Sequence, residues 1–166
     1  MGSLATIGVY EWDVDTFLAA LRDADVRRVL DVRQRRGVRG PRYAWANSLR
    51  LQAALADAGI EYRHHPELAP TTDLRRLQYA ADDRAGVGKR SRVALAPEYV
   101  EGYTREILDR ADLGPVVAEL PRDGRATLLC VEADPEACHR SLIAARLETE
   151  HGIPTTHLRP PEVMSS

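Results

Sequence analysis

The stretch from Cys130 to Arg140 concentrates more reactive side chains than any other part of the chain. It reads Cys-Val-Glu-Ala-Asp-Pro-Glu-Ala-Cys-His-Arg, so a thiol and a carboxylate follow an apolar run, and a second thiol, an imidazole and a guanidinium come soon after Pro135. Proline often occupies the first position of a helix, and we expect a helix from Pro135 to about His151. The free N–H groups at a helix start favour an anion, so Cys138 should form a thiolate more readily than an ordinary cysteine.

These residue types suggest an enzyme active site. We expect Glu132, Cys138 and His139 to be catalytic, with Cys138 as the candidate nucleophile and Glu132 or His139 as the group that moves a proton. Simpler roles are also open. Free cysteines are commonly buried as small apolar side chains, and a buried carboxylate such as Glu132 commonly pairs with an arginine.

Substrate-binding residues are expected on other segments. In open α/β sheets, ligands bind beyond the carboxyl ends of the strands, and several polar residues follow expected strands. Arg33, Arg140 and the helix start at Pro135 could together hold a phosphate or carboxylate. His64 and His65 cannot both face the same side of a strand. The full set of expected substrate-binding residues is Asp31, Arg33, Arg39, Tyr43, His64, Cys130 and Arg140.

Standard cofactor and metal motifs do not match. The run Gly86-Val-Gly-Lys-Arg-Ser departs from the P-loop pattern, since Arg90 stands where Ser or Thr is needed. A phosphatase or rhodanese loop needs an arginine six residues after its cysteine, and Glu136 holds that position after Cys130. Cys130, Cys138, His139 and one histidine of the third strand are zinc-binding types, but their spacing is not a standard zinc pattern. We therefore expect no metal and no cofactor.

Two basic segments support a nucleotide or nucleic-acid ligand. The loop from Arg33 to Trp45 holds five arginines together with Tyr43 and Trp45, a combination that suits phosphate contact and base stacking. A solvated loop with Trp45 packed on the sheet rim is the alternative. The second segment is Lys89 to Arg92.

The remainder of the chain alternates short apolar runs with amphipathic segments. Strands are expected at about 5–9, 26–32, 60–64, 127–131 and 154–158. Helices are expected at about 13–25, 48–58, 71–81, 97–110, 115–120 and 135–151. Strands separated by helices imply a mostly parallel sheet covered on both faces. We predict an α/β fold with three layers and five strands, Rossmann-like or flavodoxin-like. Residues 1–160 should form one domain, followed by a loose tail at 161–166.

Composition narrows the classes of partner. The 166 residues are 44% hydrophobic, which is enough for a core, and the net charge of -2 argues against a protein that binds membranes or nucleic acid through its overall charge. Neither a signal peptide nor an apolar run long enough to cross a bilayer is present in the sequence, so a cytoplasmic protein without a membrane partner is expected. The two cysteines are expected to be free thiols. The oligomeric state is open.

Several short motifs together resemble the DUF488 family of uncharacterised prokaryotic proteins. They are Thr6-Ile-Gly8, Asp31-Val-Arg33, Arg39 to Tyr43, Gly59-Ile-Glu-Tyr62, Pro66-Glu-Leu68 and the stretch Cys130 to Arg140. The last is the most specific. The resemblance implies a compact α/β fold with a polar site built from these segments, and it implies no particular reaction. Val9 to Trp12 and Ala69-Pro70 depart from the family pattern, at what should be the rim of the site.

Three functions are compatible with these residues, and a purely structural or partner-binding role is a fourth alternative. The first is a small enzyme that binds an anionic or nucleotide-like ligand at the carboxyl rim of the sheet. The second is a nucleic-acid or nucleotide binding module without catalysis, supported by the two basic loops. The third is a thiol redox or metal-handling protein, supported by the two cysteines.

Overall fold

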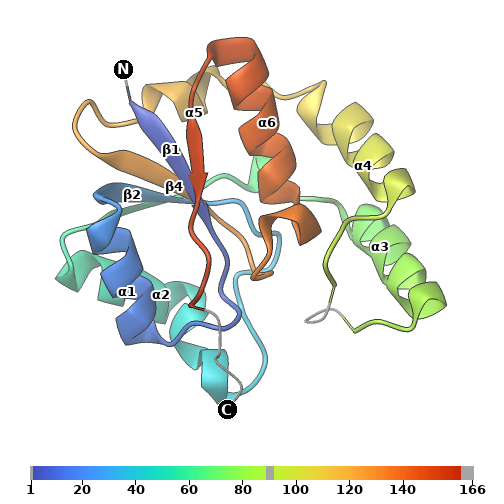
Figure 1. Ribbon diagram of the computed structural model, residues 1–166, viewed down its shortest axis with the longest axis horizontal. Coiled ribbons are helices and arrows are strands. Elements are labelled where there is room, and N and C mark those ends of the chain that lie inside the picture. Colours follow the sequence, from blue (N-terminus) through green and yellow to red (C-terminus); the bar gives the residue numbers. More distant parts are fainter. Residues whose placement is uncertain (1, 89–91, 162–166) are drawn as a thin grey trace.

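The structure is a computed structural model that describes residues 2–88 and 92–161. Its centre is a sheet of five strands in the order β3-β2-β4-β1-β5, and every pair of neighbours is parallel (Figure 1). The strands are β1 (Ser3–Ile7), β2 (Val26–Asp31), β3 (Glu61–His64), β4 (Arg125–Leu129) and β5 (Thr155–His157). The predicted three-layer α/β fold is confirmed, and the sheet is wholly parallel.

Helices cover both faces of this sheet. On one face lie α1 (Val14–Asp23) and α2 (Ser48–Asp57), which bury Phe17, Leu21, Leu51 and Leu55 against β1 and β2. The other face carries α3 (Thr72–Ala85), α4 (Pro97–Tyr103), α5 (Gly114–Ala118) and α6 (His139–His151) (Figure 1). Short 3-10 segments lie at Pro41–Ala46, Pro66–Leu68 and Pro135–Ala137. Within the described ranges, none of the helices is both long and apolar enough to span a membrane.

Local sequence explains where several helices begin and end. Asp13 accepts a hydrogen bond from the Thr16 backbone, and the Thr16 hydroxyl accepts one from Asp13, so α1 begins with a capping box. Thr71 caps α3 through the backbone N–H of Leu74. Gly152 ends α6 in the left-handed conformation, as expected from its position.

Three helix predictions were wrong in detail. α3 continues to Ala85 instead of stopping near Ala81, because Gln78 and Asp82 form a buried polar pair that apolar periodicity cannot reveal. The helix predicted over 97–110 changes at Thr104 to a π-helix that ends at Leu108. The helix predicted from Pro135 begins only at His139, because Cys138 is extended and occupies the N-cap position.

The end of β1 lies against the segment that follows β4. The backbone N–H groups of Val9 and Tyr10 both donate to the carbonyl of Val131, at 2.9 Å each. Gly8 lies so close to Glu132 that a Cβ atom at position 8 would overlap the Glu132 carbonyl oxygen. A glycine is therefore needed here for a close backbone approach, and this approach places Glu132 beside the first strand.

We predict that Gly8→Ala lowers the free energy of unfolding by at least about 1–3 kcal/mol, the usual cost of forcing extra atoms into a packed site. Urea unfolding followed by circular dichroism measures the change. Gly88→Ala is the matched control, since a Cβ at position 88 meets nothing within 4 Å. Equal stability of the two variants would show that the backbones of Gly8 and Glu132 are not packed as described.

His65 follows β3 and joins two acidic side chains. Its Nδ1 lies 2.7 Å from Glu67 and its Nε2 lies 2.5 Å from Glu119, which also lies 3.9 Å from the Arg63 Nε. Burial would lower the pKa of His65, but the two carboxylates outweigh burial and raise it above its ordinary value. The protonated imidazole therefore stabilises the folded state.

This linkage predicts a pH-dependent stability. The contribution of His65 is fully present below the unfolded-state pKa of about 6.5 and is lost as pH rises through the higher folded-state pKa. The difference in unfolding free energy between the wild type and His65→Gln should shrink from pH 5.5 to pH 8, two values that bracket about 6.5. Urea titrations at each pH measure it, with the exposed His151→Gln as control. A pH-independent difference would contradict the prediction.

Candidate functional site

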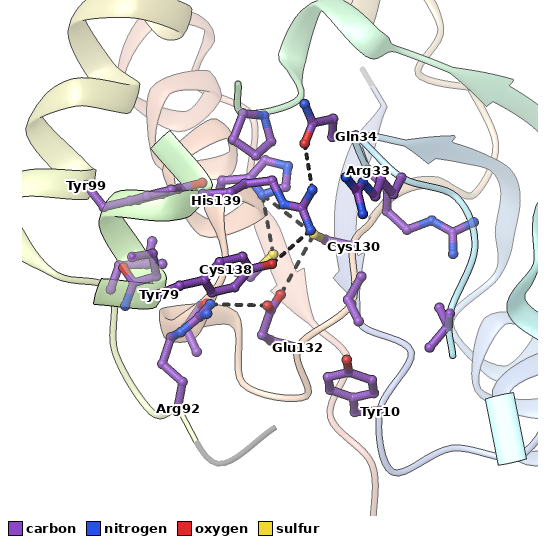
Figure 2. Close-up of a pocket in the computed structure, with 18 of the residues that line it drawn as sticks. Tyr10, Arg33, Gln34, Tyr79, Arg92, Tyr99, Cys130, Glu132, Cys138 and His139 are labelled. Carbon is purple, nitrogen blue, oxygen red and sulfur yellow. Dashed lines mark hydrogen bonds and ion pairs between the residues drawn. The ribbon is translucent and has the colours of Figure 1, made fainter. Parts of the chain in front are cut away.

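A cavity of about 660 Å³ opens at the carboxyl ends of β2 and β4 (Figure 2). Its walls come from the segments after these two strands, from the loop after β1, and from α3 and α4. Among the described residues that line it, five are arginines, namely Arg33, Arg35, Arg39, Arg75 and Arg92, and only Glu132 carries a carboxylate. Two of these arginines, Arg33 and Arg92, are paired with the buried carboxylates of Asp31 and Asp82, so the positive charge of the lining comes mainly from the other three.

Six of the ten residues predicted for the site line this cavity. They are Arg33, Arg39, Cys130, Glu132, Cys138 and His139. They come from the ends of two strands and from the start of α6, so the parallel topology does bring distant segments together (Figure 2). The other four, Asp31, Tyr43, His64 and Arg140, lie outside the lining.

The two thiols share one imidazole nitrogen at the floor of the cavity. His139 Nδ1 lies 3.5 Å from the Cys130 Sγ and 3.7 Å from the Cys138 Sγ. His139 Nε2 lies 2.8 Å from the carbonyl oxygen of Val32, which can only accept, so Nε2 carries a proton and donates it. All three side chains are buried, and both cysteines are free thiols.

The protonation states within this cluster differ. Burial raises the pKa of the Cys130 thiol well above its ordinary value. Burial acts in the same sense on Cys138, but the hydrogen bond with Cys130 and the charge of His139 outweigh it and hold the Cys138 pKa well below its ordinary value. Burial lowers the pKa of His139, but the Cys138 thiolate and the Val32 carbonyl raise it overall. The cluster thus favours a thiolate at Cys138 beside an imidazolium.

Glu132 lies between the thiols and a buried arginine. Its Oε2 is 3.9 Å from the Cys130 Sγ, and its Oε1 accepts from Arg92 at 3.2 Å (Figure 2). Arg92 also donates to both oxygens of Asp82, at 2.8–3.1 Å, and to the carbonyl of Ala137. Arg92 thus positions the Glu132 carboxylate and compensates its buried charge. Of the second basic segment, 89–91 lie outside the described residues, and Arg92 is part of this internal network.

Arg33 pairs with Asp31, which explains why the two residues occur together in the motif Asp31-Val-Arg33. The Arg33 guanidinium donates to both Asp31 oxygens, at 2.8–3.2 Å, and to the carbonyl of Ala46 at 2.9 Å. Tyr62 donates to the same carboxylate at 2.6 Å. Arg33 still borders the cavity, but its donors are committed within the protein, so it sets the shape and charge of the wall.

Arg140 supports the loop after β4 and does not reach the cavity. It is completely buried and donates to the carbonyls of Glu132 and Ala133, at 2.7 and 3.2 Å, and to the Thr6 hydroxyl. We predicted it as an anion-binding residue because it follows His139 near a helix start. On a helix, adjacent residues point in different directions, so His139 faces the cavity while Arg140 faces β1.

Three further residues considered for ligand contact, Tyr43, Trp45 and His64, have other environments. The Tyr43 ring is buried, and its hydroxyl accepts from the Glu11 backbone at 3.0 Å. Trp45 packs on Phe17 of α1, with ring centroids 4.8 Å apart. His64 is half-buried, and its Nε2 lies 3.2 Å from the carbonyl of Arg33.

The sequence reasoning missed several wall residues. Arg75, Tyr79 and Tyr99 line the cavity, and Arg75 donates to Gln34 and to the Tyr79 hydroxyl, at 2.8 Å each. Arg75 and Tyr79 share one face of α3 at a spacing of four residues, a signal that could have grouped them. Tyr10 and Pro70, at the two departures from the family pattern, also line the cavity.

A family model supports the assignment that the motifs suggested. The model of DUF488, a domain of unknown function, matches residues 13–147. The chain belongs to the DUF488 family. Neither a curated protein nor a solved structure matches it. The family match covers most of the cavity, including Arg33, Glu132 and the Cys130–Cys138–His139 cluster, and Tyr10 precedes it.

Arg33→Met tests whether Arg33 is structural. Removing the arginine leaves the Asp31 carboxylate buried without its charge partner, which should lower the free energy of unfolding by about 3–5 kcal/mol. Guanidinium unfolding measures it, and Arg35→Met, an exposed arginine of the same loop, should cost less than about 0.5 kcal/mol. Asp31→Asn combined with Arg33→Met should recover much of the loss. If Arg33→Met is as stable as Arg35→Met, the ion pair does not support the fold.

Proposed function

We propose that this DUF488 protein is a small enzyme that binds an anionic, nucleotide-sized substrate in the cavity and reacts with it at the buried Glu132, Cys138 and His139. The observation that carries the proposal is the position of the thiol–imidazole cluster directly beneath an arginine-lined opening. A cavity of about 660 Å³ falls within the usual range of small-molecule sites.

The charge of the rim supports an anionic substrate. Arg35 and Arg39 are exposed at the opening, and Arg75 beside them is half-buried and donates to Gln34 and Tyr79, whereas Arg33 and Arg92 are buried and paired with carboxylates. Guanidinium groups bind phosphate and carboxylate through paired N–H donors. These three side chains are therefore the proposed anion-binding residues, in place of Arg140.

The residues of the cavity walls indicate that the substrate carries a planar group attached to its anionic part. Tyr10, Tyr79 and Tyr99 line the cavity together with Val38 and Leu95. Aromatic side chains stack on flat rings such as nucleobases. An aromatic wall combined with a guanidinium rim suits a nucleotide-like molecule better than a simple inorganic anion.

The floor supplies the reacting groups. In the metal-free protein, the Cys138 thiolate is the attacking group, with His139 as its charge partner. Glu132 is within reach of the same space and is the group that transfers a proton. Because thiols persist most easily in a reducing compartment, we place the enzyme in the cytoplasm.

A binding module without catalysis is the competing function. It would use the basic loop and its aromatic residues to stack bases, but Tyr43 and Trp45 pack into the protein. A module of this kind also has no use for two thiols and an imidazole beneath its ligand. Both observations favour the enzyme.

Titration calorimetry with adenosine 5′-monophosphate as the probe tests the proposed anion-binding arginines. Arg39→Ala and Arg75→Ala should each weaken binding about tenfold or more, because a hydrogen bond to a charged group contributes about 1.5–3 kcal/mol. Arg105→Ala, an exposed arginine on the π-helix, is the control and should bind normally. Adenosine should bind more weakly than the monophosphate. The proposal fails if removing the phosphate, Arg39 or Arg75 leaves affinity unchanged.

Measurement of turnover tests the proposed reacting residues at the floor of the cavity. The protein is incubated with a panel of nucleoside mono-, di- and triphosphates, and products are detected by mass spectrometry. Cys138→Ser and Glu132→Gln should reduce any turnover by about a hundredfold or more while leaving affinity within threefold, because proton transfer contributes about 10²–10⁴ to rates. Binding without turnover of any member of the panel would instead support the binding module.

A further inference from the structure

Three metal-ligand atoms converge at the floor of the cavity. The Sγ atoms of Cys130 and Cys138 and one ring nitrogen of His139 all lie within 4.8 Å of one another. They come from the residue after β4 and from the N-cap and first residue of α6. Thiolate sulfur and imidazole nitrogen are the donors that zinc prefers in proteins.

The two sulfur–nitrogen distances of this cluster fit a tetrahedral ion. With zinc–sulfur bonds of about 2.3 Å and zinc–nitrogen bonds of about 2.0–2.1 Å, tetrahedral geometry requires sulfur and nitrogen to be about 3.6 Å apart. The two sulfur–nitrogen distances here are 3.5 Å and 3.7 Å. Both therefore accommodate one ion with little rearrangement.

The orientation of His139 is a second and independent observation. Its Nε2 donates to the Val32 carbonyl at 2.8 Å, so Nδ1 is directed at the two sulfurs. Histidines that bind metals usually donate their other ring N–H to a carbonyl or carboxylate, which fixes both the tautomer and the ring. The ring is further packed against Tyr103, with centroids 5.5 Å apart.

The fourth position would face the cavity. All three donor residues line it, and so does Glu132, whose Oε2 is 3.9 Å from the Cys130 Sγ (Figure 2). Structural zinc sites are closed by four protein ligands, whereas catalytic sites have three and leave one position for water or substrate. Two thiolates also balance the charge of one Zn²⁺ with a neutral imidazole.

We propose that Cys130, Cys138 and His139 form a Zn²⁺ site that opens onto the cavity, with water at the fourth position and Glu132 as its base. This inference deepens the proposed function and relies on it only for the substrate. Glu132 would take a proton from the water, and the oxygen would form a bond to the electrophilic carbon or phosphorus of the substrate as the bond to the leaving group breaks. Glu132 would then return the proton to the leaving group. The metal-bound oxygen would then replace the Cys138 sulfur as the attacking atom.

Metal stoichiometry tests this site without any measurement of turnover. Wild-type protein purified without chelator and incubated with zinc sulfate should hold about one zinc per chain by elemental mass spectrometry. Cys130→Ser, Cys138→Ser and His139→Ala should each lower the content at least tenfold. His64→Gln, a half-buried histidine outside the cluster, should keep it. Zinc retained in all three cluster variants, or no zinc in the wild type, overturns the site.

Cobalt replacement keeps the test valid if a variant fails to fold. Wild-type protein loaded with Co²⁺ should show the sulfur-to-cobalt charge-transfer absorption and the visible bands of a tetrahedral ion; octahedral bands alone would reject the assignment. If the wild-type protein holds no zinc and the Cys138→Ser variant still loses turnover, the zinc site is rejected and the mechanism with a Cys138 thiolate stands. Zinc binding without any affinity for the nucleotide probe overturns the proposed function and leaves the metal site standing.

Discussion

The hydrogen bond from His139 to the carbonyl of Val32 is the contact on which the candidate site depends. It joins the end of β2 to the first turn of α6, two segments 107 residues apart in the chain. With Nε2 committed to that carbonyl, Nδ1 must face the cavity floor, where both sulfurs lie. The same contact therefore sets the position of the imidazole and determines that Nδ1 is the nitrogen that faces the sulfurs.

A second constraint is that the buried charges around the site must be compensated. Arg33, Arg92 and Arg140 are nearly or completely buried, and each is satisfied by carboxylates or backbone carbonyls of neighbouring segments. Charged groups taken out of water require such partners. These three arginines connect the segments after β2, β4 and α3, so they hold the cavity walls in place.

The sequence predicted the architecture well because its signals are local. Alternation of apolar runs with amphipathic segments is enough to predict a parallel sheet between two helical layers, and the motif from Cys130 to Arg140 is enough to recognise the family. Polar interactions that extend a helix could not be predicted from this local pattern. Gln78 and Asp82 lie inside α3 because Arg92, ten residues beyond Asp82, returns to pair with it.

The types of reacting side chain, their order and their position at the carboxyl ends of strands were determined by the sequence alone. Only the tertiary structure decided which guanidinium groups line the cavity and which, like that of Arg140, lie outside it. His139 and Arg140 are neighbours in the chain, but one reaches the two sulfurs and the other binds the backbone beside β1. The physical reason is that a side chain's direction follows from the local backbone, whereas its partner is whichever distant segment packs against that side of the element.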